Sequence, residues 1–148
     1  MKKCLIVYDS YHHGNTAKIA SAMAETAGAE LCKADGIKNK NLADYDMIGF
    51  GAGIAYGKHY SGLMEAVEGL SLNGKPVFVF STSGMGSTAS HSALSDLLKK
   101  KGAVIAGDFA CKGFDTYGPF KLVGGISKGH PSDADLEAAN QFILEMVK

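Results

Sequence analysis

Short apolar segments alternate with amphipathic helical segments along almost all of this 148-residue chain. The clearest apolar segment, residues 77–80, reads Val-Phe-Val-Phe, and residues 4–8 and 47–51 have a similar composition. Strands that are apolar at every position are typical of parallel sheets, because helices cover both faces of such sheets. The pattern therefore predicts an α/β fold, a doubly wound five-stranded parallel sheet in three α/β/α layers.

The remaining strands and helices are predicted from the spacing of the apolar residues. Two more strands are expected at residues 29–34 and 103–111, and helices around residues 17–27, 63–70, 94–101 and 132–146. Ser132 is the expected N-cap of the last helix, with acidic residues in the turn that follows it. A length of 148 residues favours one domain over residues 1–148.

Three of the predicted strands run into loops rich in glycine and small polar residues, at 9–16, 52–60 and 81–87. In doubly wound sheets, ligands bind outside the carboxyl ends of the strands, where the strand order reverses. The first loop also precedes a helix, and the amides and dipole at a helix start favour an anion such as phosphate. A capped helix start without a ligand is the alternative for this loop taken by itself.

The first loop resembles the phosphate loop of the flavodoxin family, whose pattern is roughly Ser/Thr-x-Thr-Gly-Asn-Thr. Here Gly14-Asn15-Thr16 matches the end of that pattern, and Ser10 stands near its start. The loop is one residue longer than the pattern, and His12 and His13 occupy the place of a threonine. The resemblance implies that these residues hold the phosphate of FMN.

The other two loops are similar to the flavodoxin loops that enclose the flavin ring. The stretch from Gly51 to His59 is similar to a Gly-Ser-x-Ile-Tyr-x-Gly-Lys type found in short-chain members. The resemblance implies ring contacts from Ala52, Gly53, Ile54, Ala55, Tyr56 and Gly57, and from Thr82, Ser83, Gly84, Met85 and Gly86. Tyr56 is the best stacking candidate, although it is also explained as an ordinary surface aromatic residue. Met85 stands where many flavodoxins have an aromatic residue, and methionine can also lie against a ring.

The largest departure from the family is an insertion at residues 114–128, between the last strand and the last helix. It carries three aromatic residues and leaves from the carboxyl end of the last strand. One interpretation is that these residues cover the edge of the sheet. The other is that Phe114 or Tyr117 approaches the flavin, and Phe114 is therefore included among the candidate cofactor contacts.

Composition excludes several other classes of protein. Lys+Arg and Asp+Glu are both 15, so charge favours neither a nucleic acid nor a membrane as a partner. All 15 basic residues are lysines, and the missing arginines argue against a bidentate clamp on a pyrophosphate. The three cysteines are far apart and show no metal-ligand or dithiol spacing, which predicts reduced thiols and a cytoplasmic protein. The N-terminus leads straight into a strand, without the pattern of a signal peptide.

Competing motifs fit poorly. Ala52 and His59 replace the glycine and Ser/Thr that a P-loop would need, and Gly51-Ala52 replaces the phosphorylated aspartate of a receiver domain. A loose dinucleotide pattern begins at Gly84, but after the fourth strand rather than the first. His91 is expected on a solvated helix start, and no Ser/His/Asp set follows from spacing.

The resemblance implies an FMN-binding electron carrier that works between a reductase and an acceptor protein. Two alternatives remain open. One is an FMN-dependent reductase that acts directly on a small substrate under the insertion. The other is a binding module of the same fold that carries no cofactor.

Overall fold

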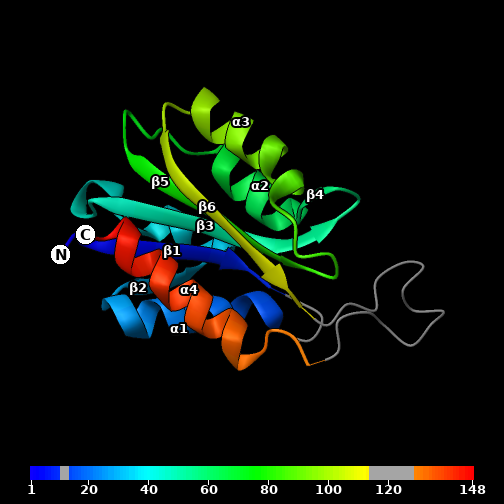
Figure 1. Ribbon diagram of the computed structural model, residues 1–148. Coiled ribbons are helices and arrows are strands. Elements are labelled where there is room, and N and C mark those ends of the chain that lie inside the picture. The colour runs from blue at the N-terminus through cyan, green and yellow to red at the C-terminus, as the bar shows by residue number, and fades with distance from the viewer. Residues whose placement is uncertain (11–13, 114–128) are drawn as a thin grey trace.

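A computed structural model describes residues 1–10, 14–113 and 129–148 (Figure 1). Its strands are β1 (Cys4–Asp9), β2 (Glu30–Lys33), β3 (Met47–Ala55), β4 (Lys58–His59), β5 (Pro76–Ser83) and β6 (Val104–Lys112). Its α-helices are α1 (Asn15–Ala27), α2 (Ser61–Glu68), α3 (Ser92–Lys100) and α4 (Asp133–Met146). The described residues also include three short 3₁₀ helices, η1 (Ala34–Asn39), η2 (Leu42–Asp44) and η3 (Thr88–His91).

Five strands form the predicted parallel sheet, in the order β2-β1-β3-β5-β6. The chain moves from β1 to β2 in one direction and then crosses to β3 on the other side of β1, so the order reverses between β1 and β3. Helices α1 and α4 cover one face and α2 and α3 the other, which gives the three predicted layers (Figure 1). β4 was not predicted; it pairs antiparallel with the end of β3.

The apolar strands are buried on both faces, as their composition predicts. In β5, Val77 and Val79 belong to the core under α2 and α3, and Phe78 and Phe80 to the core under α1 and α4. The two phenylalanine rings need room that β3 supplies through glycine. A Cβ at Gly49 would lie 2.2 Å from the Phe78 ring. This close packing explains why an otherwise bulky buried strand contains glycine.

Helix ends follow the sequence signals. Ser132 caps α4, because its hydroxyl accepts from the Asp135 amide while the Asp135 carboxylate accepts from the Ser132 amide. This confirms the predicted cap. The α1 helix instead starts at Gly14, whose φ of 65° lies in the left-handed region.

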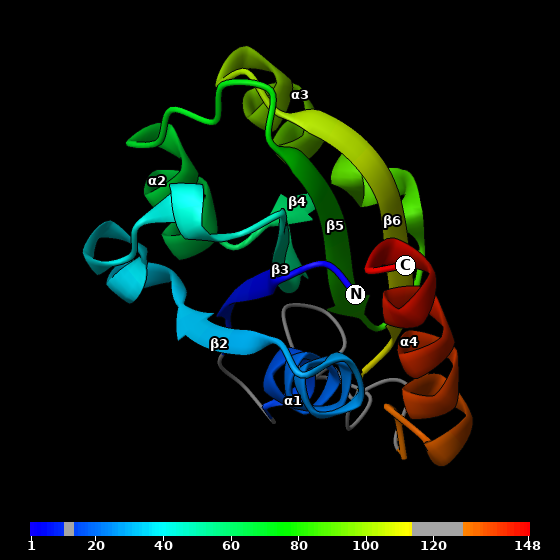
Figure 2. The same ribbon diagram turned by 90° about the vertical axis from the view of Figure 1, so that its left-hand side faces the viewer.

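The connection from β2 to β3 departs from the strand–helix alternation of the other parallel strands in the described chain. It consists of η1 and η2 instead of a full α-helix, and it lies beside α2 (Figure 2). In the described ranges, no helix is long and apolar enough to cross a membrane.

Candidate functional site

The carboxyl ends of β1, β3 and β5 lie side by side. Asp9 pairs with Ala52, and Ala52 pairs with Ser81, so the three segments that follow leave the sheet at neighbouring positions. This edge also lies at the reversal of strand order between β1 and β3, where doubly wound sheets bind ligands. The structure therefore brings together the three loops that the sequence singles out.

The first segment ends at the start of α1. Gly14 is the N-cap, and a Cβ there would meet no atom of the described residues within 4 Å. The Ser10 hydroxyl accepts from the Ala17 amide at 3.3 Å, which leaves the hydroxyl hydrogen to donate elsewhere. His12 and His13, predicted to contact a phosphate, lie outside the described residues.

The first turn of α1 is joined to the end of β5. The hydroxyl oxygens of Thr16 and Thr82 are 2.7 Å apart, and both residues are buried. Gly113, after β6, packs against the Asn15 amide group, because a Cβ there would lie 2.6 Å from Asn15 Nδ2. Thr16 therefore faces β5, and its contribution to an anion site would come from its backbone amide.

The second predicted loop, at residues 52–60, is wrong in extent. β3 continues to Ala55 and pairs with β4, so Ala52 and Gly53 lie within the sheet and are buried. Ile54 and Ala55 are half-buried at the end of β3. The turn itself is Tyr56–Gly57, with φ values of 53° and 79°, as a tight two-residue hairpin requires.

Tyr56 projects from this hairpin and is 89% exposed. The third loop carries a second exposed apolar residue, Met85, at 68%. That loop begins after Ser83, whose hydroxyl accepts from the Gly86 amide at 2.9 Å. Thr82 and Ser83 are therefore the last residues of β5, while Gly84, Met85 and Gly86 form the loop. Phe114, the remaining predicted contact, lies outside the described residues.

These features fit a flavin mononucleotide in three respects. The first turn of α1, Asn15–Lys18, contains no acidic residue, so the partial positive charge of this helix end is available to one phosphate. The donors beside it, Ser10 and the backbone at Gly14, are neutral and small. Tyr56 and Met85 supply large exposed apolar surface at the same edge of the sheet, which is suited to a planar ring.

His91 corrects the prediction of a solvated helix start. It is only 2% exposed, and its Nε2 lies 2.6 Å from Ser81 Oγ, while Nδ1 lies 3.1 Å from Asp108 Oδ2. Burial lowers the pKa of His91, and the Asp108 carboxylate opposes that shift. The order of contacts is that of a Ser-His-Asp triad, which spacing did not reveal. Ser81, however, is completely buried, so its hydroxyl cannot attack a substrate from solvent.

His59 lies against His91, with ring centroids 5.1 Å apart. Its Nε2 is 2.9 Å from the Phe80 carbonyl oxygen, and burial lowers the pKa of the imidazole to about 4. A helical repeat could have revealed part of this arrangement. His91, Leu94 and Leu98 are spaced by three and four positions, and all three are buried on one face of the segment that leads into α3.

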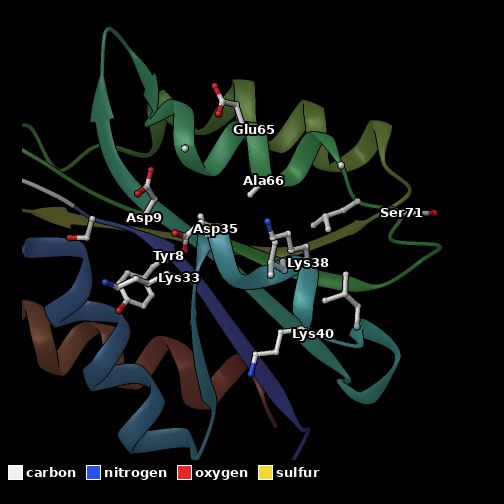
Figure 3. A pocket seen from close by; sticks show the side chains of 16 residues that line it. Tyr8, Asp9, Lys33, Asp35, Lys38, Lys40, Glu65, Ala66 and Ser71 are labelled. Atoms are coloured by element: carbon white, nitrogen blue, oxygen red, sulfur yellow. The ribbon is translucent and has the colours of Figure 1, made fainter.

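A groove of about 810 Å³ runs between η1 and α2 (Figure 3). Asp9 and Asp35 lie toward the start of α2, and Lys38, a residue of η1, lines the groove beside α2. Of the predicted site residues that the structure describes, the groove contains Ser10. Burial raises the pKa of Asp9; the Leu63 backbone opposes this shift and the Asp35 charge adds to it.

The fold, with three segments that leave neighbouring strand ends, defines a protein of the flavodoxin-like class. The model of the flavodoxin domain family matches residues 5–115, and the chain belongs to this family. An uncharacterized protein of Methanocaldococcus jannaschii is 42% identical over 148 residues, with 99% of each chain covered. Among solved structures, oxidised flavodoxin 2 of Bacillus cereus has a TM-score of 0.70 at 20% identity, over 96% of this chain and 95% of that one. Fusobacterium nucleatum flavodoxin bound to flavin mononucleotide has a TM-score of 0.66 at 13% identity, over 99% and 97%.

Proposed function

We propose that this chain binds FMN and carries electrons in the cytoplasm between a reductase and an acceptor protein. The observation that supports this most strongly is the meeting of three predicted loops at one edge of the sheet, at the reversal of strand order. Membership of the flavodoxin family adds to it. The bound flavin would supply the redox chemistry, and the chain would supply binding, orientation and electrostatics.

The two ends of FMN have different sites in this proposal. The phosphate binds at the start of α1, in contact with Ser10, Gly14, Asn15 and Thr16 and, directly or through water, with at least one of His12 and His13. The ring lies between the hairpin residues Ala52–Gly57 and the loop residues Thr82–Gly86, with Phe114 as a further contact. The exposed Tyr56 and Met85 side chains support the ring site.

The second candidate is an FMN-dependent reductase of a small substrate, and the groove between η1 and α2 is a cavity large enough for a small molecule. The groove meets the first loop at Ser10, so a molecule bound in it would lie beside the proposed phosphate site. A carrier and a reductase differ in what they need for turnover. A carrier accepts electrons from a partner enzyme, whereas a reductase oxidises its own nicotinamide donor.

The test is to reconstitute the purified protein with FMN and follow NADH and NADPH oxidation. The carrier proposal predicts slow oxidation by the protein itself and rapid flavin reduction once a flavodoxin reductase is added. Rapid oxidation without any reductase would favour the second candidate. A protein that stays colourless with added FMN would contradict both and would favour the cofactor-free binding module.

A further inference from the structure

Two buried histidines lie behind the two loops that would enclose the flavin ring, and the proposed function does not use either of them. His59 follows the Tyr56–Gly57 turn and is 1% exposed. His91 ends η3, at the far end of the loop that contains Met85. The imidazole rings contact each other, with centroids 5.1 Å apart.

His91 closes the loop that leaves β5. Ser81 stands on β5 just before the loop, and His91 stands where the chain enters α3, so the bond of 2.6 Å between Ser81 Oγ and Nε2 joins the two ends. The other ring nitrogen, at 3.1 Å from Asp108 Oδ2, ties the same point to β6. One imidazole therefore fixes the segment 82–90 to two neighbouring strands.

His59 fixes the hairpin in the same way. Its Nε2 donates to the Phe80 carbonyl oxygen at 2.9 Å, which joins β4 to the middle of the sheet. This bond leaves Nδ1 without the proton, and Nδ1 is buried with no hydrogen-bond partner among the described residues. His91 has the opposite tautomer, because the Asp108 carboxylate requires a proton on Nδ1 while Nε2 accepts from Ser81.

We propose that His59 and His91 are positioning residues that hold the two ring-binding loops at a fixed separation, and that flavin affinity falls when either imidazole is protonated or loses its bond. The inference rests on the proposed FMN site. A proton on His59 Nδ1 would be a buried charge without an acceptor. A proton on His91 Nε2 would prevent that atom from accepting the Ser81 hydroxyl.

The surroundings favour two neutral rings. Burial and the neighbouring His91 disfavour a charge on His59, and burial disfavours a charge on His91 more than the Asp108 carboxylate on β6 favours it. β5 presents the Phe80 carbonyl and the Ser81 hydroxyl, and the buried face of α3 presents uncharged leucines. Burial lowers both pKa values, that of His59 to about 4, so both rings are neutral at pH 7.

The first experiment compares Ser81→Ala with Val77→Ala. Both truncate a buried side chain of β5, but Val77 lies at the opposite end of the strand and serves as the matched control for lost stability. Ser81→Ala should weaken FMN and riboflavin binding by the same factor, about fivefold, which is the effect of one net hydrogen bond. Val77→Ala should leave both affinities unchanged. Equal effects of the two variants would overturn the proposal.

The second experiment needs no flavin. Amide exchange of the protein without FMN should become faster at Gly86 and Ala89 in Ser81→Ala than in Val77→Ala, because these amides bond to Ser83 and Ser87, within the segment 82–90 that His91 fixes. Nitrogen-15 spectra should show the opposite tautomers of His59 and His91, and both rings should titrate below the usual histidine pKa of ~6.5. Identical tautomers, or titration of both rings near pH 6.5, would overturn the proposal.

The third experiment uses His59→Gln, whose amide can still donate to the Phe80 carbonyl but cannot be protonated near pH 4. Riboflavin affinity of the natural protein should fall below about pH 5, and this fall should be smaller in the variant, in which only His91 can still be protonated. If the natural protein binds neither flavin at any pH, the proposed function fails, while the exchange and tautomer measurements still decide whether the histidines anchor the loops. Riboflavin affinity with the same acid dependence in both proteins would contradict the role of His59.

Discussion

Thr16 and Thr82 are 66 positions apart in the sequence, and their hydroxyl oxygens are 2.7 Å apart in the structure. The bond joins the first turn of α1 to the end of strand β5, and both side chains are buried. In the proposed function, this bond therefore links the segment that binds the phosphate of FMN directly to a strand end that contacts its ring. Removing either hydroxyl would leave its partner buried without this bond.

Thr16→Val and Thr82→Val should each lower the free energy of unfolding by about 1–3 kcal/mol, the range for an unsatisfied buried polar group. The double variant should lose less than the sum, because no unpaired hydroxyl remains. Urea unfolding of the three variants and the natural protein measures this coupling. Strictly additive losses would show that the two hydroxyls do not interact.

The phosphate end can be tested by comparing FMN with riboflavin. Asn15→Leu should weaken FMN binding several-fold and affect riboflavin less, since Asn15 stands in the first turn of α1, where the phosphate is proposed to bind. Fluorescence titration with both flavins measures the two affinities. Unchanged affinity for both would show that the phosphate binds elsewhere.

The histidine pair of the first loop predicts a pH effect specific to FMN. If His12 or His13 contacts the phosphate, a proton on that ring near its usual pKa of ~6.5 should tighten FMN binding at mildly acidic pH. Riboflavin should show no such increase. His12→Thr with His13→Thr should remove the effect, and a double variant with the natural pH dependence would dismiss the idea.

Much of this arrangement could be predicted from local sequence. Neighbouring residues alone indicate the loop and helix start at Gly14-Asn15-Thr16. They also indicate the buried strand at Val77. β4 was missed because Tyr56–Gly57 lacks the usual Asn-Gly signature of a two-residue hairpin. Contacts such as Ser81 with His91 depend on how β5, η3 and α3 pack, and no spacing rule encodes that.

His59 also makes stability depend on pH. Its pKa is about 4 in the folded state and ~6.5 when unfolded, so between these values the unfolded chain binds one proton more. The free energy of unfolding should therefore fall as pH decreases from ~6.5 to ~4, by about 3 kcal/mol from this group. Urea unfolding across this range should show a smaller fall for His59→Gln. Parallel curves for the two proteins would mean that His59 does not titrate as described.

Lys58 is the residue that we expect to influence the reduction potential of a bound flavin. It is exposed on β4 next to the Tyr56–Gly57 turn, and residues 51–60 and 81–91 contain no acidic side chain. A cation near the reduced flavin favours its anion, so the lower of the two reduction potentials should be less negative than in flavodoxins with acidic surroundings. Lys58→Glu should make it more negative, whereas Lys99→Glu at the far end of α3 should not. Equal potentials in all three proteins, measured at low salt, would rule out the effect.

The most direct test of FMN binding is the visible spectrum of the purified protein with and without added FMN. We expect a flavin spectrum that remains with the protein after gel filtration, at one FMN per chain, with the absorption maxima shifted from those of free FMN. Tyr56→Ala should reduce the shift, because the turn that carries this exposed ring is proposed to contact the flavin. A protein fraction that stays colourless after incubation with excess FMN would contradict the account.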